Sequence, residues 1–250
     1  MRRGIFVAPF DELAEPRLVA DLAARAEARG WDGFFIWDHI AYDAPVRAVA
    51  DPWIVMSAMA CATQRIALGP LVTPVPRRRV QKLARETATL DHLSGGRLIF
   101  GAGLGGDRGG ELSAWNEELD PRARGRLLEA GLERLAELWA GGFEPRPVQQ
   151  PRIPVWLAVR WPNRRPLARA ARWDGIFPIE LEPEDLAVYV EELRALRGGS
   201  LDGFDVVVTN RPGTDLAPWE AAGATWCLTG WGPQPRAAAV AAVIDAGPEA

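Results

Sequence analysis

Histidine and lysine are nearly absent from this chain. Its 250 residues include two histidines, His39 and His92, and a single lysine, Lys82. A barrel hydrolase with a catalytic metal centre needs several imidazole ligands, so two histidines exclude that class, and we expect no metal site. Lys82 falls inside a predicted helix, which argues against an aldolase whose lysine forms a Schiff base on a barrel strand.

Other familiar signals are missing too. There is no Gly-x-Ser-x-Gly elbow and no Walker lysine motif, which argues against serine acyl transfer and P-loop phosphoryl transfer. No apolar run approaches the roughly 20 residues of a membrane helix, and residues 1–4 lead straight into a predicted strand rather than a signal peptide. A net charge of -4 gives no electrostatic reason to bind nucleic acid or an anionic membrane. We therefore expect a cytoplasmic protein with a small-molecule partner.

Cysteine is also scarce. Cys61 and Cys227 stand in apolar surroundings in different predicted elements. We expect two buried free thiols in a reducing compartment, rather than a disulfide.

The chain alternates short apolar runs of strand length with longer segments of helical period, which is typical of a parallel α/β fold. We count eight such pairs. The expected strands cover residues 4–10, 33–37, 65–74, 98–100, 155–159, 175–179, 205–209 and 225–229. The expected helices include one starting near Pro16, one after Asp51 and one at residues 80–94; others contain Leu128 or Trp219, start at Pro183, or run from Pro235 to Ala246.

A length of 250 residues is typical of one (β/α)8 barrel, so we predict a single TIM-barrel domain over residues 1–250. A doubly wound open sheet is the alternative that periodicity alone does not exclude. In a barrel, the catalytic groups stand at the carboxyl ends of the strands.

Trp37-Asp38-His39 ends the second predicted strand and contains one of the two imidazoles. The triplet alone supports two interpretations equally: a catalytic pair, or a histidine bonded to a neighbouring carbonyl with Asp38 capping a loop. His92 ends a helix away from the strand tips, so we expect it to cap that helix.

Residues 101–106 match the dinucleotide pattern G-x-G-x-x-G after a strand. Residues 107–110 prolong the loop instead of opening an apolar helix, which argues against a Rossmann site. We expect the glycines to let the backbone leave the barrel and let another segment pack closely. Residues 104–121 are predicted to form a long functional loop after the fourth strand.

Two more segments are candidates for ligand binding. Gly69, Pro70 and Pro74 interrupt the third strand and predict a bulge where a flat ligand could rest. Residues 160–165 carry three arginines at a helix start, and free amides with positive charge suit a phosphate. A solvated arginine cluster is the alternative.

Together these segments resemble the luciferase-like monooxygenase family, the flavin- and deazaflavin-dependent barrel enzymes related to bacterial luciferase. The resemblance covers nearly the whole chain. Its most specific part runs from Lys82 to Leu98 and continues into Gly101–Gly105, and residues 160–165 and 171–175 are also similar to the family.

The resemblance implies roles for particular residues. Asp38-His39 is similar to the pair in deazaflavin-dependent members in which the histidine faces the reactive ring and the aspartate contacts the cofactor, so His39 would be the acid or base. Pro70-Leu71-Val72 matches the bulge that supports the ring, often through a non-prolyl cis peptide. The implied cofactor-binding set, with a phosphate region after strand five, is Asp38, Pro70, Leu71, Val72, Gly103, Arg160, Asn163, Arg164 and Arg165.

The resemblance also implies an oxidoreductase that performs hydride transfer or monooxygenation on a small organic substrate, as a homodimer. Its cofactor would be coenzyme F420 or FMN, and Asp38-His39 favours F420. Residues 77–79 could meet the acidic tail of F420, although a solvated helix start is the preferred interpretation. Some sugar-phosphate dehydrogenases of the family have a catalytic glutamate just after the strand-four glycines. Gly106 and Asp107 stand there, so that acid is not carried over.

Two other functions stay open. The chain could be a non-catalytic barrel subunit that pairs with an active partner, although the intact Asp38-His39 argues against this. It could also be another barrel enzyme that uses the arginine loop to bind a phosphorylated substrate.

Overall fold

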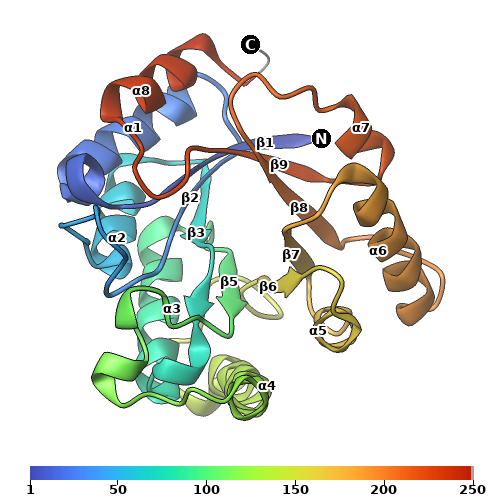
Figure 1. The fold of residues 1–250 in the computed structure, drawn as a ribbon. Coiled ribbons are helices and arrows are strands. Elements are labelled where there is room, and N and C mark those ends of the chain that lie inside the picture. The colour runs from blue at the N-terminus through green and yellow to red at the C-terminus, as the bar shows by residue number, and fades with distance from the viewer. Residues whose placement is uncertain (249–250) are drawn as a thin grey trace.

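The structure, a computed structural model, describes residues 1–248 as a ring of parallel strands surrounded by helices (Figure 1). The strands are β1 (Arg2–Val7), β2 (Gly33–Ile36), β3 (Ala67–Pro70), β4 (Thr73–Pro74), β5 (Phe100–Gly103), β6 (Val155–Arg160), β7 (Gly175–Ile179), β8 (Asp205–Asn210) and β9 (Trp226–Gly230). The α-helices are α1 (Pro16–Ala28), α2 (Pro52–Ala62), α3 (Val80–Ser94), α4 (Pro121–Glu137), α5 (Arg164–Ala170), α6 (Pro183–Leu196), α7 (Ala217–Ala221) and α8 (Ala237–Ala246).

The third strand of the barrel is divided into two pieces, which pair with the neighbouring strands on either side and so close the ring. The strand order is β3-β2-β1-β9-β8-β7-β6-β5-β4, with β3 paired to β2 and β4 paired to β5. Both ends of this order are pieces of one chain segment, joined across a bend at Leu71 and Val72. The predicted eight-stranded barrel is therefore confirmed, and the open doubly wound sheet is wrong. The single domain over residues 1–250 stays a prediction, and its last two residues lie outside the described part.

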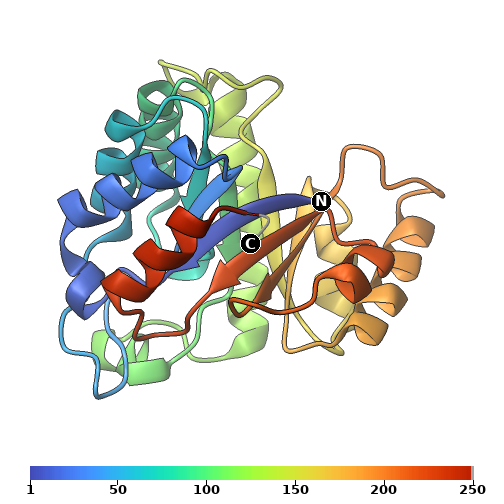
Figure 2. The same cartoon turned by 90° about the horizontal axis from the view of Figure 1, so that it is seen from above.

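The helix starts follow local signals in the sequence. Pro16 occupies the first turn of α1, and the Asp51 carboxylate accepts a hydrogen bond from the Ile54 amide at 3.0 Å to cap α2. At the other end of α3, Gly95 takes the left-handed conformation with φ 68°. In Figure 2, helices lie on the outside of the ring of strands.

The interior of the barrel is packed with large apolar side chains. Phe35 of β2 contacts Trp156 of β6 at a centroid distance of 5.3 Å, and Trp156 contacts Trp226 of β9 at 5.4 Å. These strands lie on different sides of the ring, so their side chains fill its centre. A ligand must therefore bind at the mouth rather than inside the barrel.

Two glycines allow β3 and β5 to approach closely. A Cβ atom at Gly69 would lie 1.9 Å from the carbonyl oxygen of Ile99, and one at Gly101 would lie 2.1 Å from that of Pro70. No larger residue fits at either position without movement of the backbone. The expectation that glycines serve close packing is confirmed, and the packed segment is the bend of the third strand.

Three expectations need correction. Cys227 is buried as expected, and burial raises the pKa of its thiol, but Cys61 is exposed on α2. His92 does not cap its own helix: its Nε2 lies 2.6 Å from the carbonyl oxygen of Arg146. The first strand starts at Arg2 and ends at Val7, because Phe10 turns away to bridge Val49.

Within residues 1–248, no helix is long and apolar enough to cross a membrane.

Candidate functional site

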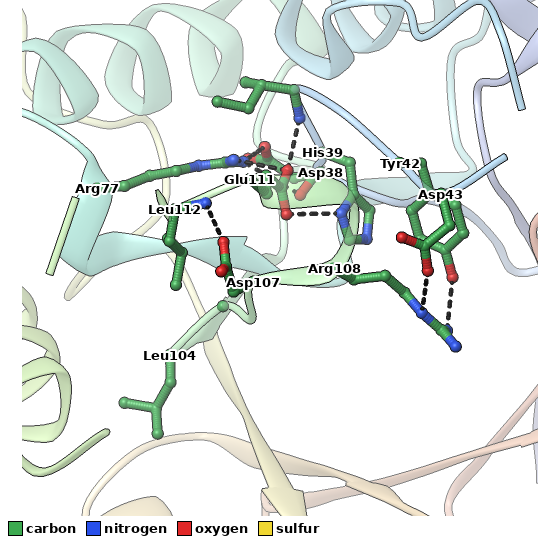
Figure 3. A network of polar contacts seen from close by, with 12 residues as sticks. Asp38, His39, Tyr42, Asp43, Arg77, Leu104, Asp107, Arg108, Glu111 and Leu112 are labelled. Atoms are coloured by element: carbon green, nitrogen blue, oxygen red, sulfur yellow. Dashed lines mark hydrogen bonds and ion pairs between the residues drawn. The ribbon is translucent and has the colours of Figure 1, made fainter. Parts of the chain in front are cut away.

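His39 stands just after β2 and contacts a carboxylate from another loop. Its Nδ1 lies 2.9 Å from Oε2 of Glu111, and the Ile40 amide donates to Oε1 of Glu111 at 2.6 Å (Figure 3). Glu111 belongs to the loop of residues 104–120 that follows β5. The carboxyl ends of two barrel strands thus bring an imidazole and a carboxylate together at the mouth.

The loop folds locally so that Glu111 points at His39. The Asp107 carboxylate accepts hydrogen bonds from the amides of Leu112 and Ser113, both at 2.8 Å, and Leu112 is buried. This turn fixes the backbone on the far side of Glu111. Asp107 therefore shapes the loop, while Glu111 supplies the acidic group of the site.

The Glu111 contact determines the tautomer of a neutral His39. An ionised carboxylate only accepts hydrogen bonds, so Nδ1 carries the hydrogen and Nε2 keeps its lone pair. Among residues 1–248, Nε2 has no hydrogen-bond partner, and the His39 side chain is 25% exposed. His39 can therefore accept a proton through Nε2 from a molecule bound at the mouth.

Asp38 is held by neighbouring residues of its own chain. Its carboxylate accepts hydrogen bonds from the Thr73 hydroxyl at 2.7 Å, from Arg78 at 2.7 and 2.9 Å, and from Arg77 at 2.9 Å. The side chain is fully buried. Asp38 thus lies beside His39 in sequence but faces the arginines.

Arg77 joins the two carboxylates. Its Nη2 binds Asp38, and its Nη1 lies 2.7 Å from Oε1 of Glu111. The side chains of Arg77 and Arg78 are 4% and 18% exposed, so the preferred interpretation of a solvated helix start is wrong for both. Their donors bind Asp38 and Glu111, and only Arg79 of this run is exposed.

Glu111 is ionised in these surroundings. Burial acts to raise the pKa of its carboxyl group, but the hydrogen bond to His39, the charges of His39 and Arg77, and the Ile40 amide outweigh burial. The pKa of Glu111 is consequently lower than usual. A carboxylate that stays charged favours the Nδ1–H tautomer whenever His39 is neutral.

Aromatic side chains surround the imidazole. The rings of Tyr42, Trp37 and Phe10 lie 5.1, 5.7 and 5.9 Å from the His39 ring, measured between centroids. The Tyr42 hydroxyl accepts a hydrogen bond from Arg108 at 2.9 Å (Figure 3). Arg108 belongs to the loop that holds Glu111, so this hydrogen bond connects the aromatic side chains to that loop. Trp37 and Tyr42 are half-buried, so part of each ring stays accessible next to His39.

The predicted ring-supporting bulge forms at the junction of β3 and β4. The peptide bond between Leu71 and Val72 is cis. Pro70 and Leu71 are buried, whereas Val72 is half-buried. A Cβ atom at Gly103 would lie 2.6 Å from Cγ2 of Val72, so the missing side chain lets the bulge rest against β5. These four residues are brought together as expected.

The arginine loop forms at the start of α5. Arg160 pairs with Glu180, and Arg164 pairs with Glu192 at 2.7 Å. Asn163 stands at the N-cap of α5, and its side-chain amide donates to the Arg160 carbonyl. Arg165 is exposed and has no ion-pair partner among the described residues. The structure thus gathers the four predicted residues, with acids neutralising two of them.

A cavity away from His39 lies near the carboxyl ends of β7 and β8. It measures about 360 Å³ and opens where β7 and β8, paired only at Gly175–Asp205 and Ile176–Val206, separate toward their carboxyl ends. Glu180, Glu182 and Asp185 line it. These acids would repel a cofactor phosphate, so we place the site at His39, where the acid–base groups are.

Sequence reasoning missed Glu111. The loop after β5 holds five acids, and their spacing does not indicate which one reaches His39. Glu111 reaches His39 because the Asp107 carboxylate closes a turn in this loop. The loop sequence has no periodicity from which that turn could be predicted. The five are Asp107, Glu111, Glu117, Glu118 and Asp120.

Comparisons with known proteins agree with the fold and identify the family. The sequence profile of the luciferase-like monooxygenase family matches residues 1–215. The chain belongs to this family, as the sequence resemblance predicted.

Individual relatives are named for different reactions. An F420-dependent glucose-6-phosphate dehydrogenase of Nakamurella multipartita is 35% identical over 133 residues, covering 50% of this chain and 38% of that protein. Limonene 1,2-monooxygenase of Rhodococcus erythropolis is 32% identical over 145 residues, covering 55% of this chain and 36% of that protein. The matched regions thus span less than half of either relative.

One solved structure shares the fold over almost the whole length. It is an F420-dependent secondary alcohol dehydrogenase in complex with an F420-acetone adduct, with a TM-score of 0.80 and 16% identity. The match covers 98% of this chain and 96% of that one.

Proposed function

We propose that the protein is an oxidoreductase that uses a deazaflavin or flavin cofactor, with coenzyme F420 favoured over FMN, and acts on a small organic substrate. The observation that carries this proposal is the His39–Glu111 pair at the barrel mouth. It presents an imidazole whose Nε2 has no hydrogen-bond partner among residues 1–248, beside half-buried aromatic side chains. The relatives named for F420 and for monooxygenation support the class.

His39 acts as the proton acceptor in this proposal. When an alcohol is oxidised, the carbon loses a hydride and the hydroxyl oxygen loses a proton, which Nε2 takes up. Glu111 holds Nδ1–H and stabilises the imidazolium that forms, because its charge lies 2.9 Å away. In the reverse direction, the protonated His39 returns the proton to the carbonyl oxygen.

The residues at the mouth fit a flat cofactor with an anionic arm. Val72, half-buried on the bulge, offers an apolar support, and Gly103 leaves room for the bulge to rest against β5. Arg165, with Arg160, Asn163 and Arg164 beside it, would hold the phosphate. When bound, the ring supplies the hydride acceptor or donor. Asp38 would act indirectly, by fixing Arg77 and Arg78 rather than by touching the cofactor.

The preference for F420 rests on the acid–base pair. Hydride transfer to or from a carbon that bears oxygen needs a proton acceptor beside it, and His39 meets that need. Monooxygenation with FMN is the second candidate, and the match to limonene 1,2-monooxygenase supports monooxygenation as the reaction. The intact pair argues against a non-catalytic subunit. A homodimer and a cytoplasmic location stay predictions.

Replacing His39 tests the proposal. In His39→Asn we expect kcat with an alcohol substrate to fall by about 10²- to 10⁴-fold, the usual contribution of a general base, with little change in the Kd of the cofactor. Turnover would be followed by cofactor absorbance over a panel of alcohols and ketones.

His92→Asn is the matched control, because the other histidine lies in the last turn of α3, where it contacts the Arg146 carbonyl. It should keep the native rate. Native turnover in His39→Asn would show that the proposed base is not used.

A further inference from the structure

Arg77 occupies a special position among the charged groups near His39. It is the only one of the described residues whose side chain contacts both buried carboxylates, with Nη1 2.7 Å from Glu111 and Nη2 2.9 Å from Asp38. Its Nη2 also lies 3.3 Å from the Asp38 carbonyl oxygen. The planar guanidinium therefore links the end of β2 to the loop after β5.

The two carboxylate oxygens of Glu111 have different hydrogen-bond partners. Oε1 accepts from the Ile40 amide and from Arg77, and Oε2 faces His39. Glu111 is 1% exposed, so water does not replace a lost partner easily. The orientation of Oε2 toward Nδ1 thus depends on what holds Oε1.

The charges of the buried cluster balance. Asp38 and Glu111 supply two negative charges, and Arg77 and Arg78 supply two positive charges. Around it, Tyr42 and Asp43 face the site from the loop after β2, and Arg108 faces it from the loop after β5, paired with Asp43 at 2.9 Å. A neutral His39 is the form that leaves this cluster without net charge.

Arg78 has a different set of contacts. It binds both oxygens of Asp38 and makes no contact with Glu111 among the described residues. The two neighbouring arginines therefore carry equal charge and share one carboxylate, but only Arg77 reaches the acid that orients His39.

We propose that Arg77 is a positioning residue. Its guanidinium donates hydrogen bonds to Oε1 of Glu111 and to the Asp38 carboxylate, and this keeps Oε2 of Glu111 on Nδ1 of His39. Nε2 of His39 then stays free to accept a proton. The functional importance of a free Nε2 rests on the proposed function. The contact itself can be tested without substrate or cofactor.

The test is ¹⁵N NMR of histidine side chains in the full chain, with His92→Asn as background so that His39 gives the only imidazole signals. The spectra are recorded at a pH at which the imidazole is neutral. With Arg77 present, we expect a fixed Nδ1–H tautomer with a bare Nε2. In Arg77→Gln we expect that fixed tautomer to be lost, with Nε2–H, the form favoured by a free imidazole, becoming the major species.

Arg78→Gln is the matched control, since it removes the same charge from the same cluster without touching Glu111. We expect it to keep the Nδ1–H tautomer. An unchanged tautomer in Arg77→Gln would overturn the proposal. Equal loss in both variants would overturn it too, because the effect would then follow charge rather than the Glu111 contact.

A second measurement applies if Arg77→Gln does not fold. The guanidinium ¹⁵N–¹H signals of Arg77 should be sharp in the native chain and broadened in Glu111→Gln, which removes the charged partner of Nη1. Signals that are equally sharp in the native chain and in Glu111→Gln would contradict the proposed contact between Arg77 and Glu111. A chain that binds neither cofactor would refute the proposed function while leaving these results intact.

Discussion

At the scale of single residues, the two nitrogens of the His39 imidazole have unlike surroundings. Nδ1 is hydrogen-bonded to Glu111, and Nε2 has no hydrogen-bond partner among residues 1–248. The charge state of Glu111 therefore determines which nitrogen is available for chemistry. The sequence predicted His39 from its place at a strand tip, but Glu111 came from a loop without periodicity, and only the folded turn identifies it.

Glu111 also links pH to stability. Its pKa is lower in the folded chain than the usual value of about 4.3, so its ionised form stabilises the fold above that pH, and this contribution is lost as the pH falls through the lower folded pKa. In Glu111→Gln we expect a lower free energy of unfolding at pH 7. The difference from the native chain should shrink as the pH falls below about 4.

Urea denaturation at a series of pH values measures this difference. Glu117→Gln is the control, because it lies in the same loop and its side chain makes no hydrogen bond among the described residues. A difference for Glu111→Gln that is constant from pH 7 to pH 3 would contradict the assigned charge state.

At the scale of elements, the bend between β3 and β4 both closes the barrel and forms the bulge at its mouth. Glycine and two prolines in the third strand predicted an irregularity there. The sequence did not reveal that one segment would pair with β2 before the bend and with β5 after it, because that pairing depends on strands far apart in the chain. Strand ends also shifted by one to three residues, since tertiary contacts such as Phe10 with Val49 decide where pairing stops.

The close contact between the bend and β5 predicts a sensitive position. Gly101→Ala would place a methyl group 2.1 Å from the Pro70 carbonyl oxygen, so the backbone must move. We expect a loss of about 1–3 kcal/mol in the free energy of unfolding, as for other overpacked sites, together with weaker cofactor binding.

Gly106→Ala is the matched control in the same glycine-rich segment, because no atom lies within 4 Å of its added Cβ. Thermal denaturation of the two variants compares them directly. Equal stabilities would show that the bend does not depend on the missing side chain.

At the scale of the whole molecule, the barrel and its family could be predicted from alternation, length and the signature running from Lys82 into Gly105. The same architecture holds at 16% identity to the F420-dependent secondary alcohol dehydrogenase, which shows how little of the sequence the fold requires. The chemistry of the candidate site was harder to predict from the sequence. The arginines at 77 and 78 looked like a solvated helix start until the fold placed two carboxylates against them.

The most direct test of the central claim is an equilibrium titration of the full chain with purified coenzyme F420 and with FMN, followed by cofactor fluorescence. The account predicts saturable binding with one cofactor per chain, tighter for F420, and weaker in Arg165→Gln. Binding of neither cofactor at any concentration up to the millimolar range would contradict it.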